Sequence, residues 1–172
     1  MTAIRRDTHL EFSELEKGGD GDVQVFDVNY PLGRKMRLVN VYDQLRQEGG
    51  VRSQGRPAET ARGGEIMEQE KILLGGDWNA HSDRWDPQCP PKRDATFLEN
   101  LMDVYNLVDV TDGEETNLNT RNGETSGSLI DFFVTKASMA DKLEMSTDLA
   151  TTSDHAIVCA QLRWDEGEGA KV

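Results

Sequence analysis

The feature that most constrains the fold of this chain is the stretch KILLGGDWNAHSDRW at residues 71–85. It places the apolar run Ile72–Leu74 directly before two glycines, an Asp, a Trp and an Asn. A short apolar run bounded by glycine is typical of a buried strand, and we expect residues 71–75 to form one. The Gly-Gly-Asp that follows is predicted to be the turn that ends it. Asp and Asn are common turn residues, but a carboxylate and a carboxamide at the open end of a buried strand also point to an active site.

Alternating apolar residues predict several more strands along the chain. Residues 22–43 contain two β-branched and aromatic runs around Pro31-Leu32-Gly33, which indicates a β-hairpin. Four further strands and one short helix are expected at 107–110, 128–135, 143–147, 156–164 and, for the helix, near 136–142. Asn122-Gly123 is predicted to form a turn.

Two longer helices are predicted from start signals and periodicity. Pro57 is placed to open a helix that runs through Glu70, and Gly63-Gly64 would interrupt it at a cost of about 1 kcal/mol per glycine. Asp94 is a predicted N-cap of the second helix. Its apolar residues recur at helical spacing and would face the core: Phe97, Leu98, Leu101, Met102 and Tyr105.

The length of 172 residues suits one domain, and its charge is unevenly distributed. A formal net charge of −13 argues against nonspecific affinity for nucleic acid over the whole surface. However, seven basic residues face three acidic ones between positions 34 and 62, and nine acidic residues face one basic residue between 94 and 131. This pattern is compatible with binding a polyanion together with a cation, and equally with solvated charge on loops.

Cysteine usage and the amino terminus bear on the class of protein. Cys89 and Cys159 form no paired spacing, which argues against a disulfide framework or a zinc site. The first residues, MTAIRRD, contain no apolar signal region, and no apolar run approaches membrane-spanning length. We therefore expect a soluble, intracellular protein without a membrane partner, with the nucleus as one candidate compartment.

Three short acidic groups accompany predicted strands: GDWN at 76–79, SLID at 128–131 and SDH at 153–155. Each alone is a weak signal. Asp131 is the most informative, because its apolar neighbours predict that it is at least partly buried. A buried carboxylate needs a partner, most simply a histidine or a metal ion.

Together and in this order, the three groups resemble the endonuclease/exonuclease/phosphatase family, whose members are metal-dependent phosphodiesterases and phosphatases. The stretches DVNYPLGRKMRLVNVYDQ, LLGGDWNAHSDRWDP, GSLIDFFVT and TTSDHAIV look closest to the endonuclease domains of non-LTR retrotransposons. The resemblance implies an α/β fold of the α+β type, in which two packed β-sheets flanked by helices form a four-layer sandwich. Residues 1–165 would be this domain, lacking its N-terminal strands, and 166–172 an acidic tail.

The resemblance also implies roles for individual residues. Asp77 would orient or deprotonate the attacking water, and Asn79 would hold a phosphate oxygen. Asp131 would hydrogen-bond His155, fixing its tautomer and favouring its cationic form beside the phosphate. Tyr42, at the end of the strand RLVNVY, would offer its hydroxyl to the phosphate.

The same resemblance implies a metal cofactor and a polymeric substrate. Asp154 and Asp77 would bind Mg²⁺, or Mn²⁺ in its place, directly or through water. The substrate would be the DNA backbone, and a reverse transcriptase would be a partner within a parent polyprotein.

The chain departs from the family pattern at its front. In full-length relatives the Gly-Asp-x-Asn motif comes well past the middle of the domain, whereas Asp77 precedes the middle here. The strands that would supply an Asn near the metal and a main metal-ligand Glu have no counterpart, and HLEFSELEKGG at 9–19 resembles the strand and turn after them. We therefore expect impaired activity. Two alternatives stay open: a phosphatase acting on a small or lipid phosphate, and a non-catalytic remnant of the domain.

Overall fold

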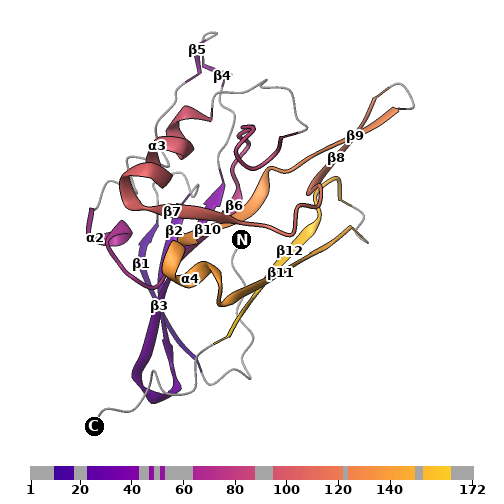
Figure 1. Cartoon of the computed structure of the whole chain (residues 1–172). Helices are drawn as coiled ribbons and strands as arrows, with labels where there is room; N and C mark the ends of the chain where they lie inside the picture. Colours follow the sequence, from indigo (N-terminus) through magenta and orange to yellow (C-terminus); the bar gives the residue numbers. More distant parts are fainter. Residues whose placement is uncertain are drawn as a thin grey trace.

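The computed structural model describes residues 10–17, 23–42, 47–48, 51–52, 64–87, 95–121, 124–149 and 153–163. Within them the chain forms one six-stranded sheet, three two-stranded sheets and a few short helices (Figure 1). The large sheet has the order β1 (Glu11–Lys17), β2 (Val23–Tyr30), β3 (Arg34–Tyr42), β6 (Ile72–Asp77), β10 (Asp131–Lys136) and β7 (Leu107–Val110). The predicted mixed α/β fold is thus confirmed.

The large sheet is antiparallel except at its centre, where β3 and β6 run parallel. The predicted hairpin is present: all of β2 pairs with β3 from Arg34 to Val41, and the 3-10 turn η1 (Pro31–Gly33) joins the two strands. The chain then crosses from β3 to β6, which pairs with β10 on its other side. As a result β6, the predicted buried strand, lies inside the sheet with a neighbour on each edge.

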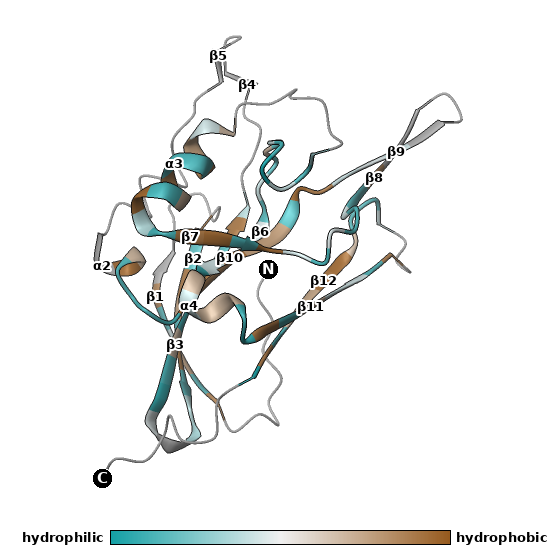
Figure 2. Ribbon diagram, in the orientation of Figure 1, coloured by the Kyte–Doolittle hydropathy of each residue, from teal (hydrophilic) through white to brown (hydrophobic). Residues whose placement is uncertain are grey.

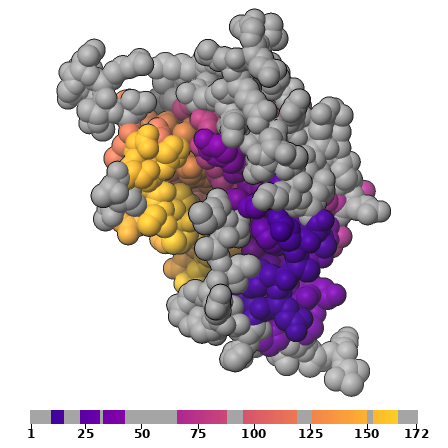
Figure 3. Space-filling model, turned by 180° about the vertical axis from the view of Figure 1, so that it is seen from behind, coloured from indigo at the N-terminus to yellow at the C-terminus, as the bar shows by residue number. Residues whose placement is uncertain are grey.

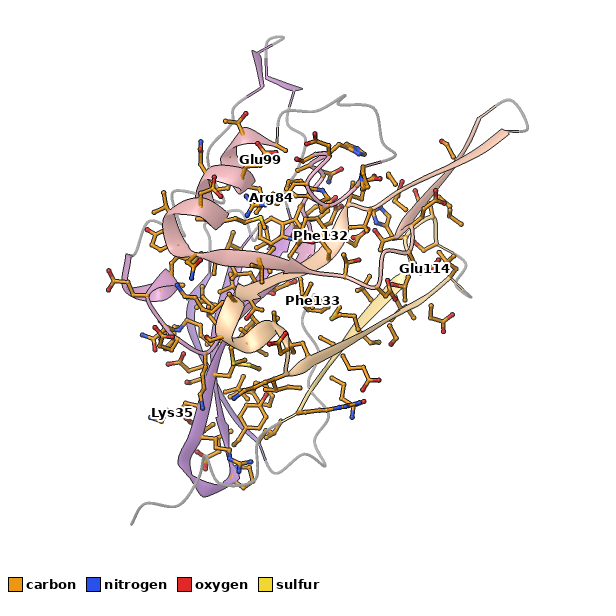
Figure 4. The ribbon with its side chains drawn as sticks, in the orientation of Figure 1. Lys35, Arg84, Glu99, Glu114, Phe132 and Phe133 are labelled. Atoms are coloured by element: carbon orange, nitrogen blue, oxygen red, sulfur yellow. The ribbon has the colours of Figure 1, made fainter. Side chains whose placement is uncertain are left out.

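Alternating side chains of the central strands fill two separate cores. Phe132 packs in the larger core with Trp78 and Trp85, with ring centroids 5.9 and 5.3 Å away, whereas Phe133 packs in the smaller core with Met139. The two phenylalanines extend to opposite sides of β10 (Figure 4). In Figure 2, brown segments mark hydrophobic residues in β7, β10 and β12. Burial on both faces is what holds the centre of the sheet in place.

The helices in the described residues are short. The most extensive is α3 (Thr96–Tyr105), which buries Leu98, Leu101 and Met102 as expected and ends at Asn106 in the left-handed conformation. Its N-cap is Ala95, while the predicted cap Asp94 lies outside the described residues. The helix predicted to run through Glu70 is present as α2 (Gly64–Met67), so its predicted end was wrong, and its earlier part from Pro57 also lies outside the described residues. Among the described segments, no helix is both long and apolar enough to cross a bilayer.

A second layer is formed by β11 (Leu143–Asp148) and β12 (Ile157–Leu162), which follow the short helix α4 (Ala137–Ala140). The residues that β11 and β12 turn toward the sheet, such as Leu143 and Leu162, join the smaller core. The face seen in Figure 3 shows β12 in yellow and the strands β1–β3 in indigo to purple. In the described part of the chain this second layer has two strands, so the full four-layer sandwich stays a prediction.

Two further hairpins project from these layers: β8 (Asn117–Arg121) with β9 (Glu124–Ser128), and β4 (Gln47–Glu48) with β5 (Val51–Arg52). The sequence predicted one strand over 128–135, which was wrong at its start. Ser128 ends β9, Leu129 and Ile130 form an irregular step, and β10 begins at Asp131. The step separates two strands with different partners, a change that the continuous apolar pattern does not reveal.

The prediction of a turn at Gly75-Gly76-Asp77 was also wrong, because β6 continues through Asp77. The two glycines serve the packing of the sheet instead. A Cβ atom on Gly75 would lie 2.4 Å from the Phe133 ring, which covers this position from β10. Gly76 has a φ of +147°, and its Cβ would lie 1.8 Å from the carbonyl oxygen of Val41 on β3. Glycine is therefore required for the close approach of both neighbouring strands.

Candidate active site

Polar residues from three adjacent strands lie side by side at one end of the large sheet. Asp77, the last residue of β6, pairs in register with Asp131, the first residue of β10. On its other side Asp77 pairs with Tyr42, the last residue of β3, whose side chain is 49% exposed. The mixed strand directions produce this arrangement, because the ends of two parallel strands meet the start of an antiparallel one.

Asp131 holds the imidazole of His155. The Nδ1 atom of His155 lies 2.9 Å from Oδ2 of Asp131, and the carboxylate is 15% exposed and the imidazole 36% exposed. An ionised carboxylate can only accept hydrogen bonds, so Nδ1 carries the proton and donates it to Asp131. The hydrogen bond expected between these two residues is therefore present.

Asp77, Asp131 and His155 form one compact group. Each offers a ligand atom, and these atoms all lie within 4.8 Å of one another. Burial, followed by the charge of Asp131, raises the pKa of Asp77 from 3.8 to about 6. Hydrogen bonds from Asn79 and the charge of His155 oppose this rise. Asp77 is thus a half-buried carboxylate whose proton affinity is close to neutral pH.

Asn79 supports Asp77 from the loop that follows β6. Its backbone N–H donates to Oδ1 of Asp77 at 3.0 Å, and its side chain hydrogen-bonds the same carboxylate. Asn79 adopts a φ of +47°, in the left-handed region that asparagine tolerates better than most residues. The Asp-Trp-Asn sequence thus forms a turn closed by its own aspartate, just after the strand end.

Asp131 and His155 form a hydrogen-bonded pair, called the dyad below, and burial and neighbouring charges shift the pKa of each in opposite directions. Burial raises the pKa of Asp131, against the hydrogen bond and charge of His155. Burial alone would lower the pKa of His155, but the hydrogen bond and charge of Asp131, with Asp77 and Asp154 beyond it, raise this pKa above 6.5. The site therefore favours the imidazolium form of His155.

The segment 153–155 is held in place through its backbone. The Ser153 hydroxyl accepts a hydrogen bond from the His155 N–H at 3.1 Å, and the Asp154 carbonyl accepts one from Leu118 N–H at 2.8 Å. Asn117 forms a β-bridge with His155. The carboxylate of Asp154 is exposed and lies outside the group of three, although its charge acts on both members of the dyad.

Sequence reasoning missed two residues that surround Asp131. One of them is Trp78, which is 4% exposed. In addition, its backbone N–H donates to the Ile130 carbonyl and its indole N–H to the Phe132 carbonyl, so it holds the chain on both sides of Asp131. Thr116 is 1% exposed and hydrogen-bonds the same stretch. The only signal for either residue in the sequence is its type, a Trp beside an Asp and a Thr before a strand.

The donor set fits a divalent cation in part. Two half-buried carboxylates oppose each other. Burial and then the charge of Asp131 raise the pKa of Asp77, and a nearby cation would oppose both effects. Carboxylate oxygens are the ligands that Mg²⁺ prefers. However, Asp131 already accepts the hydrogen bond of His155, which leaves Asp77 as the ligand that the geometry supports best.

Comparison with known proteins gives a family. The profile described as "Endonuclease-reverse transcriptase" matches residues 64–159, more than half of the chain. A Xenopus laevis protein described as "Transposon TX1 uncharacterized 149 kDa protein" is 31% identical over 140 residues, which cover 76% of this chain and 10% of that protein. The chain thus spans about a tenth of the length of this curated relative.

Solved structures show the same fold at low sequence identity. The endonuclease domain of TRAS1, a telomere-specific non-LTR retrotransposon, matches with a TM-score of 0.73 and 18% identity, over 94% of this chain and 72% of that domain. An endonuclease/exonuclease/phosphatase family protein from Leptotrichia buccalis matches with a TM-score of 0.51 and 16% identity, over 83% of this chain and 54% of that protein. By the sequence match and this fold, the chain belongs to the endonuclease/exonuclease/phosphatase family, in the endonuclease–reverse transcriptase group close to the endonucleases of non-LTR retrotransposons.

Proposed function

We propose that this chain is a DNA endonuclease domain of the retrotransposon type, which hydrolyses phosphodiester bonds with the help of a divalent metal ion. The observation that carries the proposal is the group of Asp77, Asp131 and His155, whose ligand atoms lie within 4.8 Å of one another. The family match supports a nuclease-type hydrolysis. Its relatives from transposons support DNA as the substrate and a longer parent polyprotein.

Asp77 is proposed as the general base. Phosphodiester hydrolysis needs a water that loses a proton as it attacks phosphorus. With a pKa of about 6 before a metal ion binds, Asp77 is mainly ionised at pH 7.5 and can accept a proton, and a bound cation would favour the ionised form further. The hydrogen bonds from Asn79 fix the orientation of this carboxylate. As the water oxygen bonds to phosphorus, the bond from phosphorus to the leaving sugar oxygen breaks. The leaving oxygen takes up a proton from solvent, and Asp77 releases its proton to solvent.

His155 is proposed to stabilise the charge that builds on the phosphate. Because Asp131 holds Nδ1 and favours the imidazolium, Nε2 is the atom that would donate to a nonbridging phosphate oxygen. Asn79 and the half-exposed Tyr42 are proposed to bind further phosphate oxygens. These donors surround the position at which Asp77 would activate water.

A divalent metal ion is part of the proposal because the carboxylates would otherwise repel the substrate. Asp77, Asp131 and Asp154 contribute three carboxylates against the single imidazole of His155. When bound, Mg²⁺ supplies neutralisation of the phosphate charge and a more acidic water. Asp77 and Asp154 are the proposed ligands. Two carboxylates are few for a cation that gives up water reluctantly, so we propose weak metal binding and slow turnover.

The test is nicking of supercoiled plasmid in the presence of Mg²⁺. We expect slow nicking by the unaltered chain, loss of nicking on addition of EDTA, and loss in Asp77→Asn. The matched control is Asp103→Asn, the same change at an exposed carboxylate on α3 that pairs with Arg84. Hydrolysis of p-nitrophenyl phosphate without nicking would replace the endonuclease with a phosphatase, and a folded chain without either activity would identify a non-catalytic remnant.

A further inference from the structure

A cavity of about 520 Å³ lies between the large sheet and strand β12. Among the described residues, one wall of this cavity comes from β2, β3, β6 and β10. The other wall comes from Ala156 and Val158, the first just before β12 and the second within it. Sites for small organic groups typically have volumes of about 300–1,000 Å³. The cavity is therefore large enough to hold a heterocyclic ring and part of its sugar.

The cavity lies on the same face of the large sheet as the candidate active site. Side chains an even number of positions apart on a strand point to the same face. Leu73 has this relation to Asp77 on β6, and Phe133 has it to Asp131 on β10, and both Leu73 and Phe133 line the cavity. Asp131 belongs to both places, since it lines the cavity and binds His155. A group attached to a phosphate at the dyad would thus have a direct way into the cavity.

One end of the cavity is polar. Asn40 of β3 lines it together with Asp131, and it lies in register with Gly75 on the neighbouring strand. The Nδ2 atom of Asn40 donates to Oε1 of Gln24 on β2 at 3.4 Å. A carboxamide has two N–H groups and one carbonyl oxygen, so Asn40 can also bind the polar edge of a ligand. The edges of nucleobases carry matching donors and acceptors, and asparagine is a common partner for them.

The rest of the cavity is apolar and in part aromatic. Phe26 of β2 and Phe133 of β10 contribute rings to it, and the Phe133 ring lies closely over Gly75. Aromatic side chains bind nucleobases of any sequence by stacking, because every base has a π-face. Asp131 is the one ionisable residue among the described residues of the lining. A neutral ring is therefore favoured in this space over a phosphate group.

We propose that this cavity is a subsite for a nucleobase of the DNA substrate, turned out of the strand beside the phosphate at the dyad. The base would lie between the aromatic and aliphatic walls, with its polar edge at Asn40. The proposal rests on the proposed function, because it adds a base subsite to the same site. It also makes a claim that requires no cleavage, namely that the chain binds the bases of single-stranded DNA as well as its backbone.

The variants change the cavity from its two walls. Val158→Phe fills the cavity from β12, and the matched control is Ile157→Phe, the same enlargement at the next residue, which is 54% exposed. Asn40→Leu keeps the approximate size of the side chain and removes the amide. The probes are oligo(dT) and an abasic oligodeoxynucleotide of the same length. They carry the same phosphate charge and differ by the bases alone, and a single strand requires no unpairing.

The first measurement is the Kd of each dye-labelled probe by fluorescence anisotropy, in EDTA and at one salt concentration. We expect the unaltered chain and Ile157→Phe to bind oligo(dT) about tenfold more tightly than the abasic probe, because one stacked base contributes an effect of this size. Val158→Phe should bind both probes equally, and Asn40→Leu should bind oligo(dT) at least about threefold more weakly than the unaltered chain does. Equal affinity of the unaltered chain for both probes would overturn the subsite, even in a chain that nicks plasmid.

The second measurement needs no variant, so it decides the matter if Val158→Phe fails to fold. Backbone amide spectra of the unaltered chain are recorded with thymidine 5′-monophosphate and with 2-deoxyribose 5-phosphate. We expect the nucleotide to shift the signals of Asn40, Gly75 and Val158, and the sugar phosphate to leave them in place, with Val104 on α3 as the unaffected reference. A hydrophobic dye that shifts these signals when the nucleotide does not would identify an apolar surface without base recognition and would overturn the proposal.

Discussion

Asp77 and Asp131 face each other across the antiparallel pair of β6 and β10, with His155 bonded to the second of them. Two carboxylates in such close opposition cost free energy when both are ionised. Burial raises the pKa of Asp77 to about 6, and the charge of Asp131 contributes to this rise. This arrangement groups two carboxylates and an imidazole although it raises the free energy of the folded state. Such arrangements are typical of functional sites.

The first prediction concerns stability against pH in the absence of metal. The folded state binds the proton of Asp77 more tightly than the unfolded state does, so this stabilisation is full below pH 3.8 and is lost as pH rises through about 6. His155, with its raised pKa, adds stability that is full below pH 6.5 and is also lost at higher pH. Between pH 4 and 7.5 both groups therefore make the chain less stable as pH rises.

The variant Asp77→Asn isolates the larger part of this effect. It should melt higher than the unaltered chain at pH 7.5 by roughly 2–4 °C, for an effect on the order of 1 kcal/mol after solvent screening, with little difference near pH 4. Circular dichroism melts of both proteins, with Asp103→Asn as the control, measure the difference. A melting difference that does not depend on pH would contradict the assigned pKa.

The second prediction concerns the glycine that lies under the Phe133 ring. Gly75→Ala should reduce the free energy of unfolding by about 1–3 kcal/mol, because its Cβ would overlap the ring on the neighbouring strand. Phe133→Leu leaves more room, so the double variant should lose less than the sum of the two single losses. Urea unfolding of the four proteins gives the coupling, expected at about 0.5–3 kcal/mol. Purely additive losses would show that the Phe133 ring does not restrict the size of the side chain at position 75.

The third prediction separates two buried tryptophans. Trp78→Phe removes the indole bond to the Phe132 carbonyl beside Asp131, whereas Trp85→Phe removes the bond to the Ala80 carbonyl, away from the site. Each change should reduce stability by about 1–3 kcal/mol, since each leaves a buried acceptor. The nicking rate should fall several-fold more in Trp78→Phe than in Trp85→Phe. Equal rates would mean that the backbone at Asp131 does not depend on this bond.

The fourth prediction concerns the second layer. In the described part of the chain β11 and β12 pair with each other alone, whereas β6 has a partner on each side. A two-stranded ribbon has marginal stability by itself. Amide exchange should therefore be at least about tenfold faster in Leu143–Asp148 and Ile157–Leu162 than in Ile72–Leu74. Equal protection would indicate that the two layers open as one unit.

The sequence predicted most of the strands of the large sheet and of the second layer, because β-branched alternation and turn residues are local signals. The hairpin 22–43, the strands at 107–110, 143–147 and 156–164 and the apolar face of α3 agree with the structure within a few residues. The sequence failed at Gly75 and Gly76, which were predicted to be a turn, because their requirement comes from Phe133 and Val41 on other strands.

The candidate site was also predictable in part, because its acidic motifs are local signals in the sequence. The motifs indicated Asp77, Asp131 and His155, and the resemblance gave their pairing. Thr116 could not be found, since a buried threonine in a polar stretch has no periodicity that distinguishes it. Its hydroxyl accepts hydrogen bonds from the N–H groups of Ile130 and Asp131, which lie 14 and 15 positions away along the chain.

The central claim is that Asp131 and His155 act as one unit in phosphodiester hydrolysis. The direct measurement is the Mg²⁺-dependent nicking rate of the unaltered chain, Asp131→Asn, His155→Gln and the double variant. Each single change should reduce the rate about 10²- to 10⁴-fold, and the double variant should be no slower than the slower single variant by more than about threefold. Single losses that multiply in the double variant, or nicking by Asp131→Asn at the unaltered rate, would contradict the account.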